Sequence, residues 1–156
     1  MVAVRKYRRE DARKIARLIS RTYAQFNGSE GTRDAVARYV KHFDPRGKSL
    51  DELHGQFSRS PICYVARSDS RIVGVVRGFD NRVINLFVSG KSHRQGIGTQ
   101  LMDRFEKDCR AAGFGEIVIR SSLYATLFYE SLGYRKTTGV RNFRGLKVQP
   151  MRKILD

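Results

Sequence analysis

The sequence predicts an α/β fold with a mixed, mostly antiparallel central sheet of about six to seven strands flanked by about four helices. Three observations support this fold class. Apolar residues recur with a helical period in several segments, residues 62–88 are rich in β-branched residues and broken by turn signals, and no internal repeat or linker is visible. At 156 residues the chain is expected to form a single domain, residues 1–156.

The N-terminal third predicts one strand followed by helices. The segment VAVRKY, residues 2–7, has the composition of a short opening strand. Residues 9–26 place their apolar side chains on one helical face, with acidic residues at the start where the helix dipole favours them. Residues 32–43 predict a second helix that stops before Asp44-Pro45, and residues 50–57 predict a short third one.

The middle of the chain predicts an antiparallel meander. The run ICYVARSDSRIVGVVRGFDNRVINLFV contains three β-rich stretches, separated by the turn signals SDS and DN. The strands are expected at 62–67, 71–79 and 82–88.

The last third alternates helix and strand. Residues 97–112 predict an amphipathic helix, with Glu106 and Arg110 as an i,i+4 pair on its solvent side. A strand is expected at 116–121 and a helix at 123–133, followed by two closing strands.

Net charge is the outlier in the composition. The chain has 31 Lys and Arg against 15 Asp and Glu, a formal net charge of +16. Such a field attracts polyanions, so nucleic acid, an anionic cofactor and an acidic substrate all qualify, as does a solvated basic surface. The excess is spread along the chain, with no Lys/Arg block that would mark a binding arm.

The expected location and metal content of the protein are inferred from motifs that the sequence does not contain. No apolar run approaches the length of a membrane span, and the charged N-terminus does not match a signal peptide. Cys63 and Cys109 are too few for a disulfide framework, so the cytoplasm is the expected location. No His, Cys or carboxylate cluster has metal-ligand spacing, and no metal is expected.

The stretch GKSHRQGIGTQ, residues 90–100, predicts an anion site. A Walker A motif would need a glycine where Asn85 stands, and a dinucleotide fingerprint would need one at Leu101, so both templates fail. What remains is a basic loop with Gly-x-Gly at the start of a helix, where unpaired N–H groups attract anions. An ordinary strand-to-helix turn is the alternative interpretation.

The segment LFVSGKSHRQGIGTQLM resembles the acetyl-CoA signature of the GNAT superfamily of N-acetyltransferases. Val88, Gly96 and Gly98 match its spacing, whereas Gly90 replaces the usual Pro and His93 stands where Arg or Gln is usual. A second block, SSLYATLFYESLGY, resembles a helix of the same family. The residues in register there are Ala125, Phe128, Tyr129, Glu130, Gly133 and Tyr134.

The resemblance implies acetyl-CoA as cosubstrate, with its pantetheine arm inserted between splayed strands at 83–88 and 116–121. Backbone groups of Leu86, Phe87 and Val88 would pair with the arm and polarise the thioester carbonyl. The diphosphate would be held by His93, Arg94, Gln95, Gly96, Ile97, Gly98 and Thr99. The resemblance implies that Tyr129 would protonate the departing thiolate; its place in an apolar helical stripe is also typical of a buried core aromatic.

The sequence indicates no general base. Some relatives that acetylate histones carry a glutamate four residues before the Leu86 position, and this chain has Arg82 there. Asp80 is expected in a hairpin turn. The other candidates, which are expected to be surface residues rather than bases, are Glu30, Asp34, His42 and His54.

The predicted function is transfer of an acetyl group from acetyl-CoA to a primary amine by direct attack in a ternary complex. The acceptor is left open as a small molecule or a protein, and the positive charge favours acidic or neutral acceptors over polyamines and aminoglycosides. The alternatives are a basic nucleic-acid-binding module and a CoA-binding regulator without catalysis. Nucleic acid is the less favoured partner because no RNA-binding aromatic signature or helix-turn-helix is visible. No membrane partner is expected, and a homodimer is left open.

Overall fold

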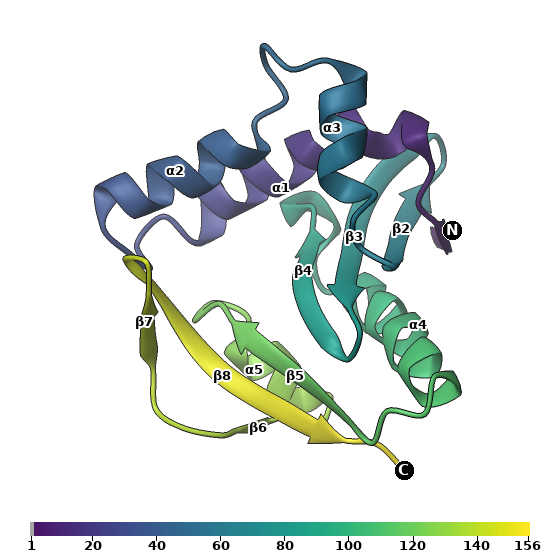
Figure 1. Ribbon diagram of the computed structural model, residues 1–156, viewed down its shortest axis with the longest axis vertical. Helices are drawn as coiled ribbons and strands as arrows, with labels where there is room; N and C mark the ends of the chain where they lie inside the picture. The colour runs from purple at the N-terminus through teal and green to yellow at the C-terminus, as the bar shows by residue number, and fades with distance from the viewer. Residues whose placement is uncertain (1) are drawn as a thin grey trace.

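The computed structural model describes residues 2–156, which form eight strands and five α-helices (Figure 1). The strands are β1 (Val2–Lys6), β2 (Ile62–Ser68), β3 (Arg71–Phe79), β4 (Arg82–Val88), β5 (Glu116–Ser121), β6 (Arg135–Lys136), β7 (Arg141–Phe143) and β8 (Leu146–Ile154). The helices are α1 (Ala12–Phe26), α2 (Arg33–Phe43), α3 (Leu50–Phe57), α4 (Ile97–Ala111) and α5 (Thr126–Ser131). Two short 3₁₀ turns lie at Arg9–Asp11 and Gly90–Ser92.

The strands form one sheet in the order β1–β2–β3–β4–β5–β8–β6, and β7 pairs with the beginning of β8. Every neighbouring pair is antiparallel except β4–β5, which is parallel. The mixed, mostly antiparallel sheet is therefore confirmed, and the meander predicted over residues 62–88 is β2–β3–β4. The additional strand relative to the prediction is the two-residue β6.

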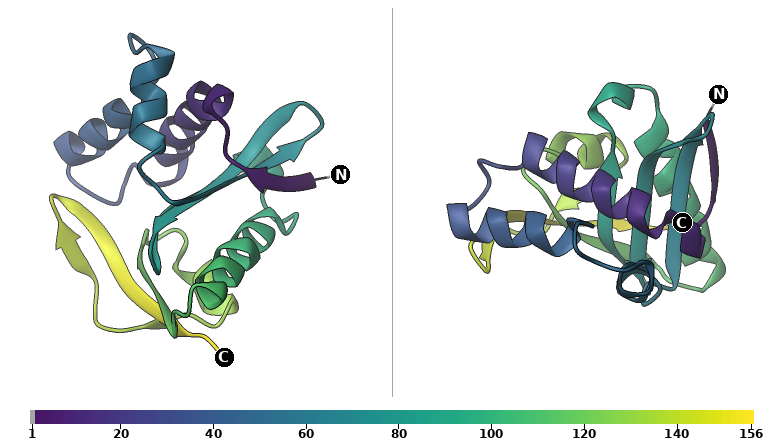
Figure 2. Two further views of the ribbon diagram at one scale, coloured as in Figure 1. Left: turned by 45° about the vertical axis from the view of Figure 1, so that its right-hand side comes forward. Right: turned by 90° about the horizontal axis from the view of Figure 1, so that it is seen from above.

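Helices cover both faces of the sheet (Figures 1 and 2). Each face has its own apolar core. On one face α1 and α3 pack against β2 and β3, with Ile15, Phe57 and Val75 fully buried. On the other face α4 and α5 pack against the sheet around Phe105 and Ile119. None of the helices in residues 2–156 combines the length and the apolar character that crossing a bilayer requires.

β4 and β5 lie side by side only at their beginnings. Arg82 pairs with Val118 and Val83 with Ile119, and within the described residues the ladder ends there. Directly after this point β4 carries a bulge at Ile84, which shifts its register against β3. A bulge bends and twists the strand that contains it, while β5 stays in register with β8 as far as Ser121. The two halves of the sheet therefore diverge (Figure 1).

The prediction that Glu106 lies on the solvent side of its helix is wrong. Glu106 on α4 is only 5% exposed, because α4 turns this position toward β6 and β8 instead of toward solvent. Its carboxylate accepts hydrogen bonds from the Tyr134 hydroxyl (3.0 Å) and the Lys153 ammonium (2.9 Å), and Arg110 lies 3.7 Å away. A buried carboxylate is tolerated when donors of this kind surround it.

We therefore expect Glu106→Gln to lower the free energy of unfolding by about 2–3 kcal/mol, since one buried donor then loses its acceptor. Glu116→Gln is the matched control, because Glu116 pairs with Arg152 at 3.7 Å on the surface and should contribute at most about 1 kcal/mol. Urea unfolding followed by circular dichroism measures both. Equal losses for the two variants would contradict a structural role for Glu106.

Candidate active site

A cavity of about 1170 Å³ lies where β4 and β5 diverge. Its floor comes from β4 and β5, and its walls come from α1, α2, the β5–α5 segment and the β7–β8 hairpin. The hairpin closes one side because it bonds the loop before α2: Thr32 N–H donates to the Gly145 carbonyl (3.0 Å), and Lys147 N–H donates to the Glu30 carbonyl (2.7 Å).

The second half of β4 presents backbone groups toward β5. Ser89 N–H donates to the Val73 carbonyl, so the alternation of an antiparallel ladder directs the backbone groups of Phe87 toward β3. The same alternation turns the N–H and C=O groups of Leu86 and Val88 away from β3, on the side where β5 has left the ladder. Phe87 instead lines the cavity with its ring, 6.4 Å from the ring of Tyr23.

The loop between β4 and α4 ends at an open helix N-terminus. Gly96 caps α4 with φ +76°, and no side chain caps the helix. The first backbone bond of α4 is Gln100 N–H to the Gly96 carbonyl (3.0 Å), so the N–H groups of Ile97, Gly98 and Thr99 have no partner inside the helix. Arg94 also has a positive φ of 63°, and residues 94–96 are exposed.

The two glycines of the motif have different surroundings. A Cβ at Gly96 would meet nothing within 4 Å, so the space over the helix start is open. A Cβ at Gly98 would lie 3.0 Å from the Phe128 ring, so Gly98 is needed for α5 to pack against α4. Thus Gly96 leaves room for a ligand, and Gly98 allows a close helix contact.

The usual signature is altered at Gly90 and at His93, and both positions lie next to the ring of Phe26. The Phe26 ring lies 3.0 Å from the position that a Cβ of Gly90 would take, and its centroid is 4.7 Å from that of His93. His93 Nε2 lies 2.7 Å from the Val88 carbonyl, which can only accept, so Nε2 carries the hydrogen. His93 therefore fixes the end of β4 to the loop.

Tyr129 on α5 lines the cavity and is 4% exposed. Its ring packs edge-on against Phe128 and Tyr134. Burial raises the pKa of Tyr129 well above its ordinary value, so the hydroxyl keeps its proton at neutral pH. The two sequence interpretations are thus compatible, because the side chain is packed in the core and also borders the cavity.

A polar network that no sequence motif indicates links β3, β4 and α2 beside the cavity. Asn85 Nδ2 donates to the Tyr39 hydroxyl (3.1 Å), and Asn85 Oδ1 accepts from the Nε of Arg77. Arg77 is 8% exposed and lies over the rings of Phe43 and Phe57, at 5.8 and 5.1 Å. The available signal was a polar side chain in an otherwise apolar strand, as both Asn85 and Arg77 are.

The cavity is bordered by seven Lys and Arg residues, which we name the basic lining. They come from α2, the loop after α2, β4, β5 and the β7–β8 hairpin: Arg38, Lys41, Lys48, Arg82, Arg120, Arg144 and Lys147. Within residues 2–156, none of these side chains forms an ion pair. The excess charge is visible in the sequence, but the place where it converges is not.

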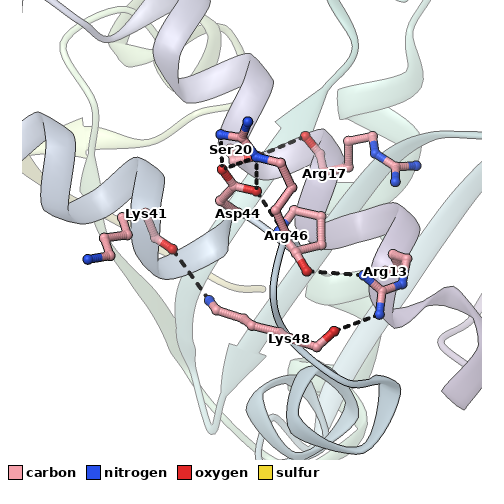
Figure 3. A network of polar contacts seen from close by, with 8 residues as sticks. Arg13, Arg17, Ser20, Lys41, Asp44, Arg46 and Lys48 are labelled. Atoms are coloured by element: carbon pink, nitrogen blue, oxygen red, sulfur yellow. Dashed lines mark hydrogen bonds and ion pairs between the residues drawn. The ribbon is translucent and has the colours of Figure 1, made fainter.

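Several members of the basic lining are held in place by neutral groups. Figure 3 shows Arg13 of α1 donating to the carbonyls of Pro45 (3.0 Å) and Lys48 (2.7 Å), which ties the loop after α2 to α1. The Lys48 ammonium donates to the carbonyl of Lys41 (3.4 Å) and to that of His42. The Arg120 guanidinium lies 4.4 Å from the centre of the Phe143 ring.

Of the base candidates, two border the cavity. Glu30 does so, but it is 6% exposed rather than on the surface. Its carboxylate accepts from the Leu123 N–H (2.7 Å), the Tyr124 N–H (3.1 Å) and Asn27 Nδ2 (2.8 Å), and so fixes the segment that leads into α5.

His42 also borders the cavity, and burial lowers its pKa, with smaller contributions from Lys48 and Arg77. The other three candidates lie outside the cavity lining. Asp34 is exposed, His54 bonds the Tyr7 hydroxyl (2.8 Å), and Asp80 lies in the β3–β4 turn with φ 54°.

These features define a class: a mixed α/β protein with a ligand cavity at a splayed parallel strand pair and an open helix N-terminus beside it. The chain belongs to the GNAT acetyltransferase family, because the family model "Acetyltransferase (GNAT) domain" matches residues 29–155. Members of this family carry out acetyl-CoA-dependent acetyl transfer. No curated protein matches the chain in sequence.

Solved structures share the fold across the whole chain. A GCN5-related N-acetyltransferase from Rhodopseudomonas palustris superposes with a TM-score of 0.81 at 20% identity, covering 98% of this chain and 95% of that one. PaiA N-acetyltransferase from Thermoplasma acidophilum, in complex with coenzyme A, gives 0.75 at 17% identity and 99% coverage of both chains. The ribosomal-protein-S18-alanine N-acetyltransferase from Escherichia coli gives 0.68 at 16% identity, covering 99% and 94%. At these identities the likeness establishes the fold.

The Glu30 contacts predict a local effect on the segment before α5. In Glu30→Gln the new NH₂ group faces either the Leu123 N–H, or both the Tyr124 N–H and the Asn27 NH₂, so at least one donor loses its acceptor. We expect the free energy of unfolding to fall by about 1–3 kcal/mol and the amide hydrogens of Leu123 and Tyr124 to exchange faster. Asp103→Asn, on the exposed side of α4, is the control. Unchanged exchange at both amides would show that Glu30 does not hold this segment.

Proposed function

We propose that this chain transfers the acetyl group of acetyl-CoA to a primary amine by direct attack in a ternary complex, with residues 1–156 acting as one acetyltransferase domain. The observation that supports this most strongly is the parting of β4 from β5 beside the unpaired N–H groups that begin α4. One strand edge and one anion site are thus placed next to each other, as an elongated ligand with a diphosphate and amide groups requires.

The residues present fit acetyl-CoA. The open space at Gly96 and the free N–H groups of Ile97, Gly98 and Thr99 suit a diphosphate. Arg94 and Gln95 are exposed beside them and can add contacts. The outward backbone groups of Leu86 and the N–H of Val88 suit the amides of a pantetheine arm, and the Thermoplasma acidophilum structure that shares the fold contains coenzyme A. His93, which bonds the Val88 carbonyl, would support the site by fixing the loop.

Acetyl-CoA supplies the acetyl group as a thioester. For the transfer, a backbone N–H of β4 is a fixed donor for the oxygen on which negative charge develops. Tyr129 is protonated at neutral pH and borders the cavity, so its hydroxyl is the proton donor placed for a thiolate that leaves there.

The basic lining contributes to the state of the acceptor amine. Nucleophilic attack requires a neutral amine, and nearby positive charges disfavour the ammonium form. Seven cationic residues around the cavity therefore lower the pKa of an amine bound there. This field promotes deprotonation at a site where Arg82 occupies the position at which some relatives carry a glutamate.

Acetyl-CoA binding depends on the space at Gly96 in this proposal. Calorimetric titration should show binding to the wild type and a dissociation constant raised about tenfold or more in Gly96→Val, because the side chain fills the space above the helix start. Gly113→Val is the matched control: Gly113 also has a positive φ (+87°) and open surroundings, but lies beyond the other end of α4. Equal losses in both variants would indicate backbone strain alone and would remove Gly96 from the site.

Tyr129→Phe should reduce kcat by about a hundredfold or more while the affinity for acetyl-CoA stays nearly constant, because only the proton donor is removed. Release of free thiol measures turnover, and calorimetry measures affinity. An unchanged kcat would show that Tyr129 is not the proton donor. A chain that binds acetyl-CoA but releases no thiol with any amine would instead be a CoA-binding regulator.

A further inference from the structure

The basic lining is not accounted for by the proposed diphosphate site. Residues 89–100, which form the loop and the start of α4, do not border the cavity. The seven cationic residues instead border the cavity, which Tyr129 also lines and where the acceptor would meet the acetyl group. Their charge therefore acts on whatever occupies the cavity itself.

The cavity contains almost no negative charge to balance these residues. Among the described residues, Glu30 is the single carboxylate of the lining, and three hydrogen-bond donors already occupy its oxygens. The chain does pair its cations where carboxylates are available, as in Arg5–Asp11 and Lys153–Glu106. The basic lining is thus a set of cations without paired anions around a cavity large enough for a ligand.

These cations surround the cavity instead of forming a patch on one side of it. Arg82 and Arg120 lie on the two strands of the floor, Arg144 and Lys147 on the hairpin, and the others on α2 and the loop that follows it. Contacts to carbonyls and to the Phe143 ring hold Lys48, Arg38 and Arg120, so part of their conformational entropy is already lost before a ligand binds. Such preorganised donors suit a carboxylate, which accepts several charge-assisted hydrogen bonds at once.

We propose that the acceptor is a primary amine that also carries carboxylate groups, which the basic lining binds while the amine points toward Tyr129. This assignment rests on the proposed acetyl transfer and specifies its substrate class. The same positive charges perform two tasks: they bind the anionic part of the acceptor and disfavour the ammonium form of its amine. A polycationic amine has no anionic group for these charges to bind and would be repelled by them.

The first test measures binding without chemistry, using three probes with the same five-carbon chain: glutarate, glutaramide and 1,5-diaminopentane. Calorimetric titration into the protein saturated with coenzyme A should show binding of glutarate alone. Arg82→Gln combined with Arg120→Gln should weaken glutarate binding about tenfold or more. Arg71→Gln combined with Lys107→Gln removes the same charge at exposed positions outside the lining and should leave the affinity unchanged.

The second test measures turnover with dipeptides that share the same reacting α-amine: Ala-Glu, Ala-Gln, Ala-Gln amide and Ala-Arg amide. The value of kcat/KM should fall in that order, with Ala-Glu about tenfold or more above Ala-Gln amide.

The outcomes separate the two proposals. Preference for the diamine, a glutarate affinity below detection, or equal loss in the control double variant would overturn the carboxylate assignment. Glutarate binding without thiol release from any amine would support an anionic ligand and contradict acetyl transfer. Turnover that is fastest with Ala-Arg amide would support acetyl transfer and contradict the carboxylate assignment.

Discussion

The divergence of β4 from β5 is the constraint on which the rest of the site depends. Each strand is held on its other side, β4 by β3 and β5 by β8, and these ladders run in different directions beyond Val83 and Ile119. The bulge at Ile84 bends β4 directly after its last pair with β5. Unpaired backbone groups and a cavity follow from this one irregularity, because strand edges within a protein need partners.

The elements around the cavity are fixed by polar contacts between segments that are distant in sequence. Glu30 bonds the segment before α5, Lys147 and Thr32 join the β7–β8 hairpin to the α1–α2 loop, and Arg13 ties down the loop that carries Lys48. These contacts place the walls at defined positions around the diverging strands. A rigid frame of this kind keeps the lining side chains directed toward a ligand at little entropic cost.

Charge is divided between two compartments of the molecule. On one side of the diverging strands, the open N-terminus of α4 offers backbone N–H groups and the exposed residues around Gly96. On the other side, the basic lining borders the cavity. An acyl carrier with a diphosphate and an acceptor with carboxylates would thus be attracted to separate places, with Tyr129 at the cavity wall contributed by α5. The large net charge is therefore organised by the fold.

The sequence by itself determined the fold class, the order of elements and the family, because periodicity, turn residues and the spacing of Gly96 and Gly98 are local properties of the chain. Other features depend on contacts between segments that are distant in sequence, so only the tertiary structure could decide them. It buried Glu106 and Glu30, which the sequence suggested to be exposed, because Tyr134, Lys153 and the Leu123 amide reach them from far along the chain. It also gathered seven of the scattered cationic residues around one cavity, which no spacing along the sequence could show.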